Sequence, residues 1–137
     1  MISLFLDTNI VIDLLAKREP FYRPAAQLFS LADNMKLQLC VSALTFANTN
    51  YILSKERKPV EARLILRKLK LLVKVIGLDE KIIDLSLNDI DFKDYEDAIQ
   101  YYSALESGAN LIITRNLKDF QKSKIPVLTA EQYLQTI

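Results

Sequence analysis

The sequence predicts one α/β domain over residues 1–137, built on a mostly parallel five-stranded sheet with helices on both faces. Short apolar segments alternate with amphipathic segments along the chain, which is typical of the strands and helices of a parallel sheet. No repeat, linker or low-complexity segment interrupts this alternation. A chain of this length can bury roughly two-thirds of its unfolded surface, so a single core suffices.

The chain contains no histidine and a single cysteine, Cys40. The absence of histidine excludes Ser-His-Asp and Cys-His catalysis and His-ligated zinc, which leaves carboxylates, hydroxyls, lysines or a hard metal ion for any chemistry. Cys40 lies in an apolar segment and is predicted to be a buried thiol without a disulfide partner. No apolar segment approaches the roughly 18 residues of a membrane span, so we expect a cytoplasmic protein with no membrane association.

The first apolar segment, residues 2–6, is predicted to be a buried strand that delivers Asp7 at its end. Ligands of open parallel sheets bind outside the carboxyl ends of the strands, so Asp7 is placed for chemistry. The alternative is that Asp7 only caps the following helix, residues 10–15, since Asp is common at that position. This helix ends before Pro20, and we expect Asp13 within it to face solvent.

The middle of the chain continues this pattern. Residues 22–34 carry apolar side chains at helical spacing and are predicted to pack on the sheet. A strand at residues 37–41 ends at Ser42, which is placed to cap a helix over residues 43–54. The next helix, residues 59–71, opens with proline in its first turn and has one apolar and one basic face.

The second half of the chain contains three predicted strands. In the strand at residues 72–78, the polar Lys74 indicates an edge position in the sheet. Helices follow at residues 79–88 and 94–107, and Gly108 is the expected left-handed residue that ends the second of them. Two further strands and a closing helix are predicted at residues 110–113, 126–128 and 130–135.

Charged residues are segregated along the chain, although the net charge is only +1. Such segregation suits an anionic polymer held near an acidic centre; the alternative is that the charges only solvate helix faces. The basic half comprises Lys55, Arg57, Lys58, Arg63, Arg67, Lys68, Lys70 and Lys74, and the acidic half comprises Asp79, Glu80, Asp84, Asp89, Asp91, Asp94, Glu96 and Asp97.

Oxygen-bearing side chains flank the first and fourth predicted strands. If these two strands are neighbours in the sheet, the side chains meet where the strand order reverses. Clustered carboxylates raise one another's pKa unless a cation neutralises them, and clusters of oxygen donors suit Mg²⁺ or Mn²⁺. The donors are Asp7 after the first strand, Asp94 and Asp97 early in the helix before the fourth strand, and Asn116 and Asp119 after it.

Four motifs span nearly the whole chain in order. They are FLDTN at residues 5–9, VSALT at 41–45, DYEDAIQ at 94–100 and IITRNLKDF at 112–120. Together they resemble the PIN-domain family, the metal-dependent ribonuclease fold to which the VapC toxins of toxin–antitoxin pairs belong. A motif match is a hypothesis about fold and function, and the structural context tests it.

The resemblance implies an endoribonuclease that hydrolyses RNA phosphodiester bonds with Mg²⁺ or Mn²⁺ as cofactor. Asp7 and Asp97 carry over as the two dependable metal ligands. Asn48 stands where the family usually has a glutamate, and Asn116 stands where many members have an aspartate. Both amides can offer an oxygen to the metal without a charge, so this site is less negative than the family norm.

Other roles follow from the resemblance and from position. Asp94 or Asp119 would hold a water molecule or a second ion during metal-assisted hydrolysis. Asn9 and Thr114 would hydrogen-bond ligands or phosphate, and Arg115 would join the basic middle helices in contacting the RNA backbone without reading bases. An antitoxin protein and a second copy of the chain are the partners we expect besides RNA.

Alternatives from other classes stay open. Asn48 could mark a degenerate centre in an inactive PIN-like domain that binds RNA or a protein. A phosphatase of the haloacid dehalogenase type would use Asp7 as a nucleophile. Those phosphatases have a second Asp two residues later, where this chain has Asn9. A response-regulator receiver would need an acidic pair on the first strand and a lysine after a late strand, and the sequence offers neither.

Overall fold

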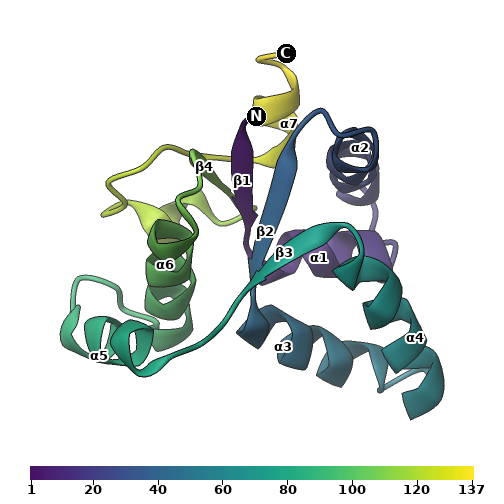
Figure 1. Cartoon of the computed structure of the whole chain (residues 1–137), viewed down its shortest axis with the longest axis horizontal. Coiled ribbons are helices and arrows are strands. Elements are labelled where there is room, and N and C mark those ends of the chain that lie inside the picture. The colour runs from purple at the N-terminus through teal and green to yellow at the C-terminus, as the bar shows by residue number, and fades with distance from the viewer.

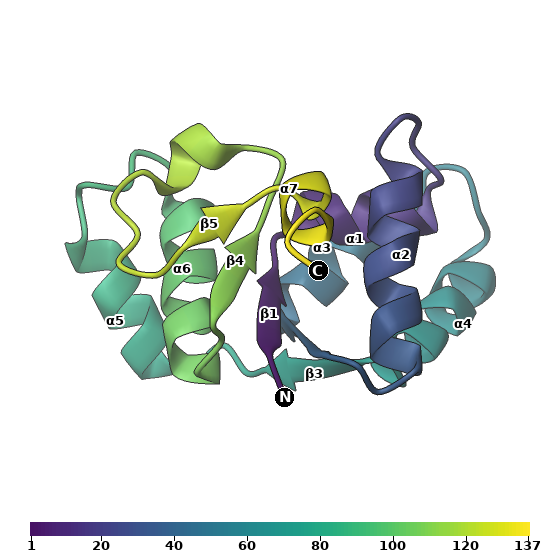
Figure 2. The same cartoon turned by 90° about the horizontal axis from the view of Figure 1, so that it is seen from above.

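Five parallel strands form the centre of the molecule, in the order β3-β2-β1-β4-β5 (Figures 1 and 2). The computed structural model describes all of residues 1–137. All four strand pairings are parallel, which confirms the predicted sheet. The strands are β1 (Ser3–Leu6), β2 (Gln38–Ser42), β3 (Val73–Ile76), β4 (Leu111–Ile113) and β5 (Val127–Leu128).

Strand β1 lies in the middle of the sheet, where the strand order reverses. Phe5 of β1 pairs with Cys40 of β2 on one side and with Ile112 of β4 on the other. The carboxyl ends of β1 and β4 are therefore adjacent, and the backbone N–H of Asp7 donates to the carbonyl of Ile113 at 2.9 Å. A binding crevice is expected at such a reversal, which places Asp7 at its edge.

Seven α-helices surround the sheet, and their ends lie within two residues of the predicted ends. Ser42 caps the third helix by accepting the N–H of Leu44 at 3.1 Å, and Gly108 ends the sixth with a φ of 72°. A short 3-10 helix, η1 (Leu117–Phe120), was not predicted. The α-helices are α1 (Thr8–Leu15), α2 (Tyr22–Asp33), α3 (Ala43–Leu53), α4 (Pro59–Lys70), α5 (Glu80–Asn88), α6 (Tyr95–Ser107) and α7 (Ala130–Leu134).

Successive residues of β1 point to opposite faces of the sheet and join two hydrophobic cores. Leu4 and Leu6 pack in one core with Leu28 of α2, on the face that α1, α2 and α7 cover. Phe5 packs in the other core with Tyr101 of α6, on the face that α5 and α6 cover (Figure 1). The prediction of helices on both faces is confirmed.

Three expectations about single residues can be compared with the structure. Lys74 is exposed on β3, which is an edge strand as predicted, and Cys40 is a buried free thiol. The expectation that Asp13 faces solvent is wrong, because its residue is 0% exposed. No helix combines the length and the apolar composition that crossing a membrane requires.

Candidate active site

Asp7 is both a strand-end carboxylate and a helix cap. It follows β1 directly, and its side chain accepts the backbone N–H of Thr8 at 2.9 Å at the start of α1. Only 8% of the residue is exposed. The two predicted roles of Asp7, chemistry and capping, are therefore compatible, since the cap uses Oδ1 and leaves further lone pairs on both oxygens.

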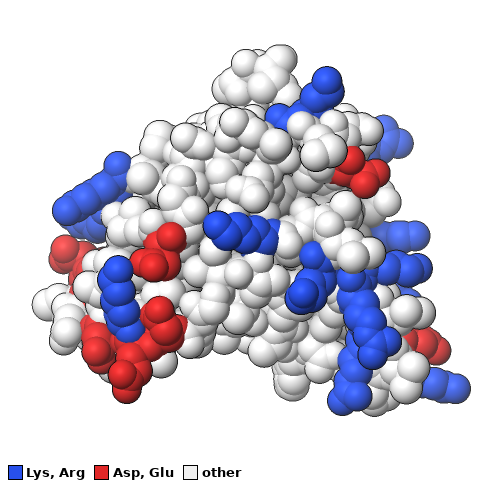
Figure 3. All heavy atoms as spheres, viewed as in Figure 1, with Lys and Arg blue, Asp and Glu red and all other residues white.

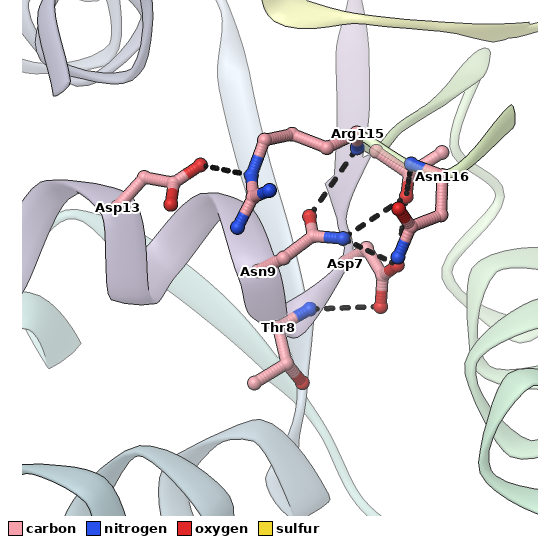
Figure 4. Close-up of polar contacts among 7 residues, drawn as sticks. Asp7, Thr8, Asn9, Asp13, Arg115 and Asn116 are labelled. Carbon is pink, nitrogen blue, oxygen red and sulfur yellow. Dashed lines mark hydrogen bonds and ion pairs between the residues drawn. The ribbon is translucent and has the colours of Figure 1, made fainter. Parts of the chain in front are cut away.

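Side chains from three other segments hold the Asp7 carboxylate in place. The Thr114 hydroxyl, just after β4, donates to Oδ2 at 2.8 Å, and the Gln100 amide on α6 donates to Oδ1 at 3.2 Å. The Asn9 amide lies 3.4 Å from Oδ2 (Figure 4). Burial raises the pKa of Asp7, while the hydrogen bonds from Thr114, Gln100 and Thr8 oppose that rise. These donors favour the ionised form that a metal ligand needs.

Gln100 is the residue of this site that the sequence reading missed. Its Nε2 lies 3.2 Å from Asp7 Oδ1, 3.2 Å from Thr8 Oγ1 and 3.3 Å from Thr45 Oγ1, so one amide links β1, α1, α3 and α6. Its Oε1 is buried without a partner. One feature of the sequence could have indicated Gln100: it is a polar residue one helical turn after Asp97, among the side chains of α6 that are buried.

We expect Gln100→Met to lower the free energy of unfolding by about 1–2 kcal/mol, because a buried carboxylate loses a donor. Loss of the orphaned Oε1 partly offsets this cost. Chemical denaturation at neutral pH measures the change, with Gln27→Met on the exposed face of α2 as the matched control. An unchanged or higher stability of Gln100→Met would show that the Oε1 penalty outweighs the bond to Asp7.

Three more of the predicted acids lie around one hollow. Asp94 caps α6 by accepting the N–H of Glu96 at 2.8 Å, Asp97 lies in the first turn of that helix, and Asp119 belongs to η1. All three line the hollow between the start of α6 and η1. Asp7 does not line this hollow, but its charge, like those of Asp94 and Asp119, acts on Asp97, so the structure brings the four predicted catalytic acids into one neighbourhood.

Asp97 is the acid most affected by its neighbours. Burial, followed by the charges of Asp119, Asp7, Asp94 and Glu96, raises its pKa from 3.8 to about 7. Near neutral pH this carboxyl group is therefore only partly ionised. Repulsion of this kind is what the sequence led us to expect of an acidic cluster without a compensating cation.

The two amide residues predicted as metal ligands have few contacts within the protein. Asn48 is half-buried on α3, and its Nδ2 lies 3.5 Å from Oε1 of the exposed Glu96. The side chain of Asn116 makes no hydrogen bond, while its backbone N–H donates to Thr114 Oγ1 at 3.0 Å. Neither amide contacts Asp7 or Asp97, so their ligand roles stay predictions.

The predicted substrate contacts also have partners within the protein. Thr114 is fully buried and donates to Asp7, and Asn9 Oδ1 accepts the backbone N–H of Arg115 at 3.4 Å. The Arg115 side chain points away from Asp7 toward α1, where its Nε donates to Asp13 Oδ2 at 2.7 Å (Figure 4). Its guanidinium lies 4.1 Å from the centroid of the Phe21 ring. Contact between Arg115 and RNA stays a prediction.

A family model described as PIN domain matches residues 3–118 of this chain. The chain belongs to the PIN domain family. The match runs from β1 to the start of η1 and so includes every residue assigned above to the candidate site except Asp119. Asp119 lies one residue beyond the matched range.

Known proteins similar to this PIN domain are named as toxins and ribonucleases. Ribonuclease VapC1 of Aquifex aeolicus is 29% identical over 140 residues, which cover 97% of this chain and 94% of that protein. A solved toxin–antitoxin complex from Klebsiella pneumoniae is 27% identical with a TM-score of 0.70, covering 93% of this chain and 98% of the other. VapBC-1 of nontypeable Haemophilus influenzae, at 20% identity, TM-score 0.70 and coverage of 95% and 99%, supports the fold alone.

The donor set of this PIN domain fits a hard divalent cation. No three His, Cys, Asp or Glu side chains are grouped closely enough to hold an ion by themselves. Mg²⁺, however, is usually bound by one or two carboxylates together with waters and substrate phosphates. Asp7 and Asp97 offer such a pair, and the raised pKa of Asp97 marks negative charge that a cation would offset.

Proposed function

We propose that this PIN domain is a metal-dependent endoribonuclease that hydrolyses RNA phosphodiester bonds and acts as the toxin of a toxin–antitoxin pair. The observation that carries the proposal is the meeting of Asp7 and Asp97 at the reversal of strand order, with Asp119 and Asp94 close enough to raise the pKa of Asp97. The similarity to a protein named as a ribonuclease and to a toxin–antitoxin complex supports it.

Asp7 and Asp97 would hold Mg²⁺ or Mn²⁺ in this mechanism, and the bound ion would acidify a water molecule and stabilise charge on the attacked phosphate. Hydrogen bonds from Thr114, Gln100 and Thr8 hold Asp7 in one orientation and favour its ionised form against the burial that raises its pKa. Asp97 gives up its proton when the cation is bound, because a carboxylate must be deprotonated to act as a ligand.

The remaining acids act on water and leaving groups in this proposal. Asp94 and Asp119 are both exposed at the hollow and have free lone pairs that can accept hydrogen bonds from water. An acid in this position orients the attacking water or receives its proton.

The antitoxin is the protein partner that we infer from the toxin–antitoxin complex among the similar structures. A homodimer is also proposed, and sedimentation of the purified protein at several concentrations tests it. Concentration-independent sedimentation at the mass of one chain would contradict the dimer.

A cleavage assay tests the proposed activity. Purified protein is incubated with single-stranded RNA in Mg²⁺, in Mn²⁺ and in EDTA, and the products are resolved on denaturing gels. We expect metal-dependent internal cleavage that stops in EDTA. A protein that binds RNA but cleaves none with either metal would instead be the binding-only PIN domain. The uncharged Asn48 favours this candidate, as does the finding that no three acids lie close enough together to hold an ion by themselves.

We expect Asn48→Glu to tighten Mn²⁺ binding at least about tenfold. One added charge at about 4 Å and an effective dielectric near 20 contributes on the order of 4 kcal/mol before desolvation offsets most of it. Calorimetric titration of Mn²⁺ measures the change, with Ala47→Glu on the exposed side of α3 as the matched control for charge. Equal affinities of both variants would show that residue 48 does not face the ion.

A further inference from the structure

The hollow beside the acidic centre is lined by lysines as well as by acids. Lys93 lies in the segment before α6, Lys118 belongs to η1, and Lys122 follows η1. These ammonium groups share the hollow with four carboxylates, among them Asp97 and Asp119. Figure 3 shows blue side chains beside the red ones on the left of the molecule, over the region of α5 and α6.

None of these three lysines forms an ion pair with the acids around it. The molecule contains two ion pairs, Lys81–Glu106 and Arg115–Asp13, and neither involves the lysines of the hollow. All three lysines are exposed, so their ammonium groups are available to a ligand. Each is within reach of the same hollow without being held by a carboxylate, an arrangement that suits an anionic ligand lying across it.

We propose that Lys93, Lys118 and Lys122 bind successive backbone phosphates of an RNA strand lying in this hollow, an inference that rests on the proposed ribonuclease function. An RNA strand is repelled by the carboxylates that the chemistry requires. Ammonium groups on both sides of the hollow offset this repulsion where the strand approaches the acids. Contacts of this type fix the position of the strand and read no sequence.

The location of these lysines changes which surface receives the RNA. The basic residues of α4 lie at the opposite end of the molecule from α6, where Figure 3 shows most of the blue side chains (Figures 1 and 2). Asp97 lines the hollow, so an RNA strand with its scissile phosphate at Asp97 must pass through the hollow before it could extend to α4. The α4 surface is then left without a role in positioning that phosphate.

Binding of a labelled single-stranded RNA, followed by fluorescence anisotropy at several salt concentrations, tests this assignment. The measurements use the Asp97→Asn protein in EDTA, so that no cleavage occurs. We expect Lys118→Gln with Lys122→Gln to weaken binding roughly tenfold and to reduce the slope of log K against log salt by about 1.4, since each single-strand phosphate contact contributes about 0.7. The exposed pair Arg23→Gln and Lys36→Gln is the matched control for lost charge.

Lys68→Gln with Lys70→Gln on α4 tests the rival surface. A larger loss of affinity in this variant than in Lys118→Gln with Lys122→Gln would overturn the proposal, as would equal losses in the control pair or a failure of the parent protein to bind RNA. The cleavage assay recognises failure of the ribonuclease function separately. If the unmodified protein cleaves no RNA, a salt slope that depends on these lysines would still support the hollow as the RNA-binding site.

Discussion

Replacing Asp97 with asparagine is expected to abolish metal-dependent RNA cleavage while making the metal-free protein more stable at pH 8. The amide removes the charge of one of the two proposed metal ligands, and we expect a loss of at least about 100-fold in rate, equivalent to about 2.7 kcal/mol of transition-state stabilisation. The cleavage assay in Mn²⁺ measures this loss. The variant keeps the size and shape of the side chain, so the fold should be preserved.

The gain in stability follows from the pKa of Asp97, which burial and then the charges of neighbouring acids raise from 3.8 to about 7. The folded protein therefore binds a proton more tightly than the unfolded chain. This contribution to stability is fully present below about pH 4 and is lost as the pH rises to about 7. The raised pKa of Asp7 acts in the same direction.

Denaturation of wild type and Asp97→Asn in EDTA, at pH 4.5 and at pH 8, checks the sign. After allowance for solvent screening at this half-buried position, we expect the variant to gain on the order of 1–2 kcal/mol over wild type at pH 8. The gain should shrink toward pH 4.5. A variant that is several kcal/mol less stable than wild type at pH 8 would mean that Asp97 has a structural role and is wrongly assigned to the site.

The positions of Asp7 and Asp97 could be predicted because local sequence patterns specify them. An apolar segment before Asp7 predicts a buried strand, and the glycine at 108 fixes the end of the helix that carries Asp97. Both of these steps depend on neighbours in sequence. The pairing of β1 with β4 was only a condition of the predicted site, and the structure meets it.

The partners of these acids could not be predicted, because they come from distant parts of the chain. Gln100 meets Asp7 across 93 residues, and Arg115 meets Asp13 across 102. Periodicity tells which face of a helix is polar, and it does not tell which polar group lies opposite. For the same reason, the block of basic residues on α4 was predicted to contact RNA and the lysines of the hollow were not. Those lysines are single residues spread along the chain between Lys93 and Lys122.

Replacing Arg115 with methionine is expected to lower the free energy of unfolding by about 3 kcal/mol, the lower end for breaking a buried ion pair by removing one partner. The side chain of Asp13 is 1% exposed and that of Arg115 is 27% exposed, so the carboxylate is the buried member. Oδ1 of Asp13 already lacks a partner, and the variant would leave Oδ2 without its donor as well. The contact with the Phe21 ring is lost in addition.

The pH dependence of this loss identifies Asp13 as its cause. Burial raises the pKa of Asp13, and the hydrogen bond and charge of Arg115 oppose that rise. Removal of Arg115 therefore raises this pKa further, so that the folded variant is stabilised by protonation at low pH and loses that stability as the pH rises. The destabilisation measured by chemical denaturation should be larger at pH 8 than at pH 4.5.

A second substitution separates the ion pair from the rest of the Arg115 side chain. The double variant Asp13→Leu with Arg115→Met leaves no buried charge at this position. Most of the lost stability should return, since apolar replacement of a whole buried ion pair is often neutral. Equal losses for Arg115→Met at both pH values, with no recovery in the double variant, would contradict the pairing. Recovery would show that Arg115 joins the segment after β4 to α1, and RNA could then engage this guanidinium only by displacing it from Asp13.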